Sequence, residues 1–140
     1  MNSVFHLLYV STARQLLDAE ALEELLVQAR ERNERLGITG MLIYGAGNFI
    51  QALEGPQQAV SDVYASIQRD QRYQHVITLV EFDDDVRDFP GWWMAYAHEP
   101  HPEKIRGCIN LLKSQQEATD KLADDRFVRR LLLNFLNTNR

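Results

Sequence analysis

Three polar side chains stand where the hydrophobic pattern calls for apolar ones, and together they could bind a polar ligand. Tyr9 and Gln51 each lie inside a short apolar segment, and strand alternation places Gln51 on the same face as Phe49. Asn33 follows Leu22 by about three helical turns, so it continues the apolar stripe of its helix. A buried amide without a partner costs about 1–3 kcal/mol. These groups therefore either satisfy one another in an ordinary core or meet a ligand that carries hydrogen-bond donors and acceptors.

The elements that must position these groups follow from the same pattern. Apolar segments predict strands at 4–10, 38–44, 48–53, 75–82 and 92–97. One helix is expected between an N-cap at Asp18 and Gly37, and a second opens at Gly55-Pro56 with the proline in its first turn. Gly45-Ala46-Gly47 predicts a hairpin turn. The run Asp83-Asp84-Asp85 predicts a solvated loop between strands.

This order of elements predicts an α+β fold with a ferredoxin-like βαββαβ sheet and an extra fifth strand. Right-handed crossovers place the two helices on one face of the sheet. The other face carries four apolar side chains, namely Leu8, Val10, Ile50 and Ala52. Helices expected at 101–115 and 121–137, or a partner subunit, must cover that face. We therefore expect a ligand-binding domain at 1–98 and a C-terminal helical extension at 99–140.

Composition argues against several classes of protein. The net charge is −5 and no cluster of Lys and Arg stands out, so nucleic acid is not an expected partner. The single cysteine, Cys108, gives no disulfide framework and is interpreted as a small buried apolar residue. The four histidines are scattered, so no metal site is expected. No signal peptide or membrane-length apolar run is found, which predicts a cytoplasmic protein without a membrane partner.

The segments that carry the polar residues resemble the BLUF family, the flavin-based blue-light sensors of bacteria. The resemblance covers about residues 3–97. It is carried by Leu8-Tyr9-Val10-Ser11, by Asn33 with Gly37-Ile38-Thr39-Gly40-Met41-Leu42, by Phe49-Ile50-Gln51-Ala52-Leu53-Glu54-Gly55, by Trp92-Trp93-Met94 and, more loosely, by Ile67 with Asp70-Gln71-Arg72-Tyr73. The third stretch, in register with the tyrosine and the asparagine, is the most specific.

The resemblance implies a non-covalently bound flavin between the two helices, with FAD as the family expectation and FMN or riboflavin as alternatives. Tyr9 would donate an electron and a proton to the excited flavin, and Gln51 would lie between Tyr9 and the N5/O4 edge of the ring. Met94 and Trp92 would lie near Gln51 and sense its rearrangement. The flavin-binding residues implied in this way are Tyr9, Leu25, Arg32, Asn33, Phe49, Gln51, Leu53, Ile67, Asp70 and Arg72.

Some of these residues receive particular roles from the resemblance. Leu25 and Ile67 would sandwich the ring, Asn33 would bond its carbonyls, and Arg72 would balance the diphosphate of FAD. Arg32 departs from the histidine or asparagine that the family carries before this asparagine. Its guanidinium would bond O2 of the ring or turn toward phosphates or water.

The resemblance implies a photosensory flavoprotein that is not an enzyme. Light would rearrange the hydrogen bonds of Gln51, shift the flavin absorption modestly to the red, and signal through the fifth strand and C-terminal helices to a homo-oligomer or an unknown downstream protein. The residues alone leave two alternatives: a light-independent regulatory domain for a small molecule, and an acylphosphatase-like hydrolase on the same fold. The hydrolase needs a phosphate-binding nest, and no glycine-rich loop is evident.

Overall fold

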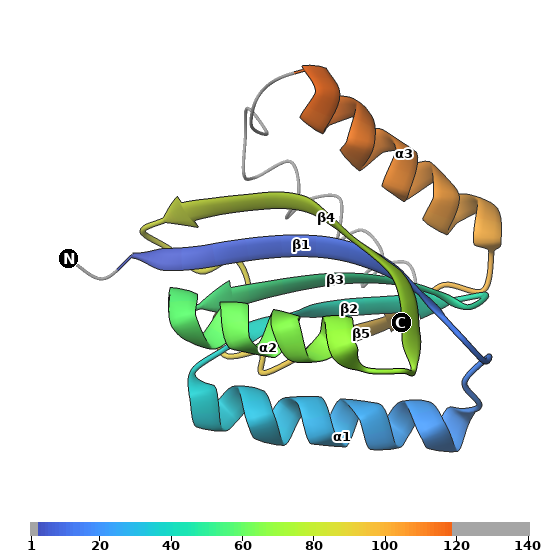
Figure 1. Cartoon of the computed structure of the whole chain (residues 1–140), viewed down its shortest axis with the longest axis horizontal. Helices are drawn as coiled ribbons and strands as arrows, with labels where there is room; N and C mark the ends of the chain where they lie inside the picture. The colour runs from blue at the N-terminus through green and yellow to red at the C-terminus, as the bar shows by residue number, and fades with distance from the viewer. Residues whose placement is uncertain (1–2, 119–140) are drawn as a thin grey trace.

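The computed structural model describes residues 3–118 of the 140-residue chain (Figure 1). In chain order the elements are β1 (Val4–Ala13), α1 (Ala19–Leu36), β2 (Thr39–Gly45), β3 (Asn48–Gly55), α2 (Gln57–Arg69), β4 (Tyr73–Asp84), β5 (Ala95–His98) and α3 (Pro102–Ala118). This sequence of elements confirms the predicted α+β, ferredoxin-like architecture with a fifth strand.

The strands form one mixed sheet in the order β4-β1-β3-β2-β5. Strand β1 pairs antiparallel with both β3 and β4, whereas β5 joins the edge by running parallel to β2. The β2–β3 hairpin turns at Ala46 and Gly47, whose φ angles of 50° and 80° are those of a tight primed turn. The β1–β3 register places Tyr9 directly opposite Gln51. Two strands far apart in sequence thereby bring the phenol and the amide to the same face.

Helices α1 and α2 both cover one face of the sheet, as the crossover rule predicts (Figure 1). Asp18 caps α1 by accepting a hydrogen bond from the Ala21 amide at 2.8 Å, and Gly37 ends the helix in the left-handed conformation with φ 73°. Helix α2 begins at Gln57, so Pro56 is its N-cap residue and not, as predicted, part of its first turn.

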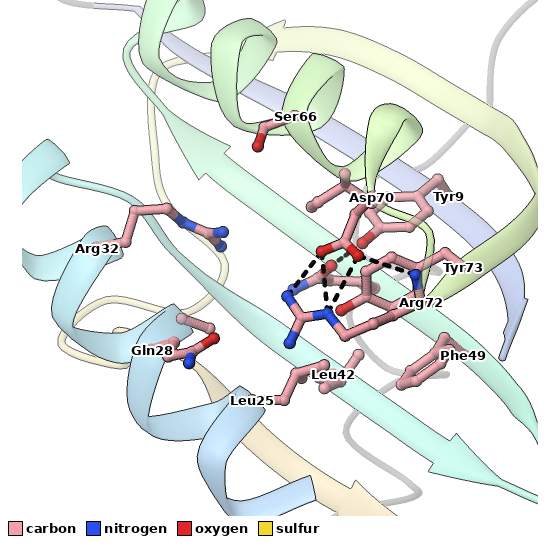
Figure 2. Close-up of a pocket in the computed structure, with 13 residues that line it drawn as sticks. Tyr9, Leu25, Gln28, Arg32, Leu42, Phe49, Ser66, Asp70, Arg72 and Tyr73 are labelled. Atoms are coloured by element: carbon pink, nitrogen blue, oxygen red, sulfur yellow. Dashed lines mark hydrogen bonds and ion pairs between the residues drawn. The ribbon is translucent and has the colours of Figure 1, made fainter. Parts of the chain in front are cut away.

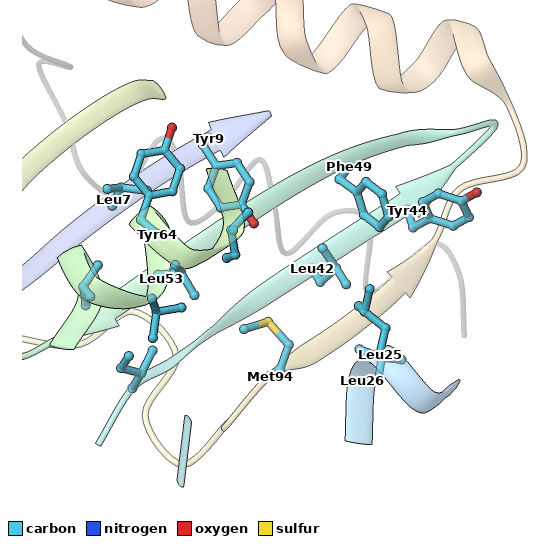
Figure 3. Packing of buried hydrophobic residues seen from close by; sticks show 14 of the residues in the cluster. Leu7, Tyr9, Leu25, Leu26, Leu42, Tyr44, Phe49, Leu53, Tyr64 and Met94 are labelled. Carbon is cyan, nitrogen blue, oxygen red and sulfur yellow. The ribbon is translucent and has the colours of Figure 1, made fainter. Parts of the chain in front are cut away.

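Two hydrophobic cores lie on opposite faces of the sheet. Under α1 and α2, Tyr9, Phe49 and Leu53 pack with residues of both helices (Figure 3). On the other face, Leu8, Val10 and Ile50 pack against three residues of α3, namely Ile105, Cys108 and Leu112. The structure thus confirms that a C-terminal helix covers the second face and that Cys108 is buried. The second helix predicted there, at 121–137, lies outside the described residues.

Several predicted strand boundaries are wrong; strand β1, for example, continues to Ala13 and does not end at residue 10. Strand β4 continues through Asp83 to Asp84, so only Asp85 of the acidic run lies beyond the strand, because pairing of β1 with β4 extends to Val4 and Asp84. Strand β5 begins at Ala95 rather than at 92, since the preceding carbonyls are taken by single hydrogen bonds outside the ladder. Among the described helices, none is long and apolar enough to cross a membrane.

Candidate functional site

A cleft lies between α1, α2 and the sheet face that they cover (Figure 2). Its empty volume is about 560 Å³, open solvent at its mouth included, and its water-accessible volume is about 90 Å³. The water-accessible volume is several times the roughly 10–15 Å³ that a single water requires, so the cleft is not filled by its own side chains. Its walls are formed by Tyr9, Leu25, Gln28, Ala29, Arg32, Leu42, Phe49, Gln51, Ser66, Ile67, Asp70, Arg72 and Tyr73.

A chain of three buried side chains starts at the floor of the cleft, which Tyr9 and Gln51 line, and continues to Met94 behind it. The Tyr9 hydroxyl donates a hydrogen bond to Oε1 of Gln51. In turn, Nε2 of Gln51 donates to the sulfur of Met94 at 3.5 Å. All three residues are buried, with exposed fractions of 5 % or less. The Gln51 amide therefore directs its acceptor end at the phenol and its donor end at the thioether.

Burial keeps Tyr9 in its protonated form. Desolvation raises the pKa of Tyr9 well above its usual value of 10.0, and the nearby phenol of Tyr73 adds to this rise. The Tyr9 ring packs against the Tyr64 ring with centroids 5.0 Å apart, while the Tyr64 hydroxyl bonds Oγ1 of Thr78 at 2.6 Å. Tyr9 is thus a neutral phenol in a fixed orientation that donates a hydrogen bond to Gln51.

Asn33 holds α1 against the segment that precedes β5. Its side chain is completely buried, and Nδ2 donates to the carbonyl of Trp93 at 2.7 Å. Arg30 makes a parallel contact, since its Nε donates to the carbonyl of Met94 at 3.0 Å. Both bonds join α1 to the backbone of the residues that lead into β5, so a displacement of the Met94 backbone would change a contact of α1.

Three charged side chains surround the mouth of the cleft. Arg72 bonds Asp70 through Nε and Nη2, with an Nη2–Oδ2 distance of 2.7 Å (Figure 2). These bonds lower the pKa of Asp70 and raise that of Arg72. Across the cleft, Nε of Arg32 donates to Oδ1 of Asn33 at 3.3 Å, and partial burial lowers the pKa of Arg32. The mouth therefore carries two guanidinium groups and one carboxylate, which favours an anionic ligand group there.

The structure brings most of the residues implied by the family resemblance to this cleft. Eight line it, namely Tyr9, Leu25, Arg32, Phe49, Gln51, Ile67, Asp70 and Arg72. Leu53 lies in the adjoining core, and the Asn33 amide is bonded to Trp93 and Arg32. Met94 contacts Gln51 as expected.

The expected position of Trp92 beside Gln51 is wrong for this structure. The Trp92 side chain is 52 % exposed and does not line the cleft, and Trp93 is 37 % exposed. The reason is that Trp92 and Trp93 precede β5, which begins at Ala95. The Trp92 carbonyl accepts a single hydrogen bond from the Gly40 amide at 3.0 Å, outside the β2–β5 ladder. Strand alternation therefore does not apply to this pair.

Sequence reasoning missed five lining residues, which are Gln28, Ala29, Leu42, Ser66 and Tyr73. Two of them lie three and four positions after Leu25 on α1, so helical periodicity would have found them. Tyr73 adds a second phenol to the cleft, and burial raises its pKa to about 12. It packs edge-on against the Phe49 ring with centroids 5.2 Å apart.

Comparison with known proteins agrees with this geometry. A family model described as BLUF, sensors of blue-light using FAD, matches residues 4–95. Among curated proteins, the photoactivated adenylate cyclase subunit beta of Euglena longa is 36 % identical over 87 residues, which are 62 % of this chain and 10 % of that protein. The chain thus spans about a tenth of the length of this relative.

Solved structures with the same fold are also similar in sequence. BlrB, described as a BLUF protein in its dark state, is 26 % identical with a TM-score of 0.70, covering 94 % of this chain and 96 % of that one. BlrP1 of Klebsiella pneumoniae, solved with FMN and cyclic diGMP, is 30 % identical with a TM-score of 0.63. That match covers 68 % of this chain and 26 % of BlrP1.

Proposed function

The chain belongs to the BLUF family of blue-light sensors that use a flavin, and from this premise we propose that Tyr9 and Gln51 are its photoactive pair. One observation carries the proposal, namely the buried chain that runs from the Tyr9 hydroxyl at the floor of the cleft through the Gln51 amide to the Met94 sulfur. A Tyr–Gln pair that served only to satisfy an ordinary core would not need to line an open cleft, as this pair does.

The residues of the cleft fit an isoalloxazine ring, and we propose FAD as the flavin. Leu25 on α1 and Ile67 on α2 offer apolar surfaces from the two helices, while the floor is polar. Such a combination suits a flat ring with one hydrogen-bonding edge. At the mouth, Arg32 and Arg72 would balance the phosphates of FAD. FMN would use the same cations, and BlrP1 was solved with FMN.

The proposed light reaction uses the two ends of the Gln51 amide. The flavin, when bound, supplies light absorption and accepts an electron, and Tyr9 supplies the electron and the proton. Gln51 carries both a donor and an acceptor on one terminal group. In the described state its carbonyl accepts from Tyr9 and its NH₂ group donates to Met94. Exchange of the two ends would direct a carbonyl at the Met94 sulfur, which has no proton to donate, so this contact would be lost.

Loss of the Met94 contact is the proposed start of the signal. Met94 immediately precedes β5, and its carbonyl is held by Arg30. Strand β5 leads through Glu99 into α3, which packs on the opposite face of the sheet. We propose that residues 1–98 form the sensor and that residues 99–140 form an extension. The extension would transmit the signal to a homo-oligomer or to a downstream protein. We also propose that residues 1–140 catalyse no reaction on an outside substrate.

The decisive experiment is a light-minus-dark absorption spectrum of the purified chain. The protein should be yellow, shift its flavin absorption to the red under blue light, and recover in the dark. Chromatography of the flavin released by denaturation identifies FAD, FMN or riboflavin. A colourless preparation that takes up no added flavin would refute flavin binding by this chain, and a bound flavin without a reversible shift would refute the photoactive pair.

A further inference from the structure

A second cluster of chemically active side chains lies away from the cleft, on the other face of β1 and β3. It consists of His6 on β1, Glu54 on β3 and Asp88 in the connection between β4 and β5. Strand alternation turns His6 and Glu54 away from the face that carries Tyr9 and Gln51, and the two are direct neighbours in the β1–β3 register. The side chain of His6 is 6 % exposed and that of Glu54 is 2 % exposed.

The hydrogen bonding of His6 fixes which ring nitrogen is available. Nε2 lies 3.0 Å from the carbonyl oxygen of Val86. A carbonyl only accepts hydrogen bonds, so Nε2 carries the proton and donates it. The other nitrogen, Nδ1, faces two carboxylate oxygens, at 3.5 Å from Oε1 of Glu54 and 3.6 Å from Oδ2 of Asp88. A neutral ring would therefore direct a lone pair at two anions.

Glu54 carries a buried negative charge, and the groups that donate hydrogen bonds to it are neutral. Glu54 accepts hydrogen bonds from Oγ1 of Thr39 at 2.6 Å and from two backbone amides, those of Asp88 and Phe89. All three donors are neutral. The nearby guanidinium of Arg87 bonds the Gly37 carbonyl, the Thr39 hydroxyl and the backbone carbonyl of Glu54. A cation at Nδ1, either a proton or a metal ion, would balance the buried charge.

The distances favour a metal ion over a proton. A charged N–H···O bond is typically about 2.7–2.9 Å long, and Nδ1 lies well beyond that from both oxygens, at nearly equal distances. Zinc binds imidazole nitrogen and carboxylate oxygen at about 2.0–2.2 Å, which places two ligands of one tetrahedral ion about 3.3 Å apart. The three ligand atoms lie within 4.8 Å of one another, so they must move closer together to bind one ion, and the partly exposed Asp88 side chain on its loop can supply that movement.

We propose that His6, Glu54 and Asp88 bind one divalent cation of the zinc type. Sequence spacing gives no sign of such a site, because its members come from two strands and a loop. The site would tie the β4–β5 connection to the middle of the sheet. That connection ends at Met94, so a metal ion bound at the site would also change the rate of dark recovery after illumination. This second effect rests on the proposed function of Met94, whereas metal binding itself does not.

Metal binding is tested on the full chain after removal of metals with a chelator. Calorimetric titration with Zn²⁺ should show one equivalent bound, and Co²⁺ should give the visible absorption bands of a low-coordinate site. Asp88→Asn and His6→Gln should each weaken binding by at least about tenfold, the loss typical when a group that supports a metal site is removed. Asp85→Asn and His98→Gln remove exposed side chains of the same types outside the proposed site and should leave binding unchanged.

Failure of the proposal would be equally visible. It is overturned if the chain binds no Zn²⁺, or if Asp88→Asn binds as tightly as the unaltered chain. Asp88 lies on a loop with a partly exposed side chain, so this variant should fold, and circular dichroism checks that it does. Nitrogen NMR gives an independent reading, because a proton that stays on Nδ1 of His6 in excess Zn²⁺ also overturns the site. The flavin spectrum of the same samples tests the photosensory proposal separately.

Discussion

At the scale of the residue, Gln51 lies between two groups and bonds both of them: the phenol of Tyr9, which we propose as the electron donor, and the thioether of Met94, which we propose as the start of the signal. Gln51→Leu should bind flavin and lose the red shift, because leucine has no amide whose ends can exchange. The shift is measured as a light-minus-dark difference spectrum. Gln28→Leu, which removes an amide at the rim of the same cleft, should keep it. A red shift of normal size in Gln51→Leu would disprove the role given to the amide.

Tyr9 is expected to be equally necessary, since its hydroxyl is the donor to Gln51. Tyr9→Phe keeps the ring and its packing on Tyr64 but removes the proton and makes electron donation much harder. We expect the reversible photoconversion to disappear in flash spectroscopy. Tyr64→Phe is the matched control, because the Tyr64 hydroxyl bonds Thr78 and not Gln51. Survival of full, reversible conversion in Tyr9→Phe would identify a different donor.

Arg72 determines, on this proposal, how the cleft distinguishes flavins that carry phosphate from riboflavin. Arg72→Gln should weaken FAD and FMN binding by about tenfold, the lower end of the roughly 1.5–3 kcal/mol typical of a hydrogen bond to a charged group, since the side chain is half-exposed. Riboflavin affinity should change little. Fluorescence titration of the flavin-free protein measures all three, with Arg69→Gln as the exposed control. An equal loss for riboflavin would show that Arg72 acts on the ring.

At the scale of the element, α3 is held to the sheet by a narrow apolar stripe. Ile105 is fully buried in the second core, whereas Leu111 on the same helix is 42 % exposed. Ile105→Ala should lower the free energy of unfolding by about 2–5 kcal/mol, through lost burial and the cavity that remains. Leu111→Ala should change it by no more than about 0.5 kcal/mol. Urea unfolding followed by circular dichroism compares the two, and similar losses would mean that α3 does not dock as described.

The strand β5 is the element that connects the two faces of the sheet. It is short, pairs with β2 alone among the described strands, and lies between Met94 and the start of α3. An edge strand of four residues has few ladder bonds to lose. Its position therefore suits an element that shifts when the Met94 contact changes, while β1 and β3, at the centre of the sheet, stay in place.

At the scale of the whole molecule, buried phenols make stability depend on alkaline pH. Burial raises the pKa of Tyr73 to about 12, and it also raises the pKa of Tyr9. An unfolded tyrosine titrates near 10, so above that pH the unfolded chain releases protons that the folded chain retains. The contribution of these phenols to the free energy of unfolding should therefore be constant up to about pH 10 and fall above it, by at most about 1.4 kcal/mol per pH unit for each such group.

Urea unfolding at a series of pH values from neutral to strongly alkaline measures this dependence. Tyr73→Phe removes one of the groups, so its curve should fall less steeply above pH 10 than that of the unaltered chain. Identical slopes for Tyr73→Phe and the unaltered chain would show that Tyr73 is not protected from ionisation.

Local rules of the chain were sufficient for much of the fold. The two periodicities, 2 for strands and 3.6 for helices, predicted which side chains of one element share a face, such as Gln51 with Phe49 on β3 and Asn33 with Leu22 on α1. The capping roles of Asp18 and Gly37 depend on neighbours within one turn, and both were confirmed. Such features are determined by the sequence because the interacting groups are close along the chain or repeat with a fixed period.

Other features were decided by contacts between distant segments, and only the tertiary structure shows them. The Asn33 amide bonds the carbonyl of Trp93, and Trp92 is exposed because β5 begins later than its sequence indicates. His6 and Glu54 meet through the register of β1 and β3, and the β4–β5 connection brings Asp88 beside them. The positions of these residues in the sequence follow no helix or strand repeat. Whether they meet is determined by the pairing register of the strands and by the path of one loop, and both depend on the packing of the entire sheet.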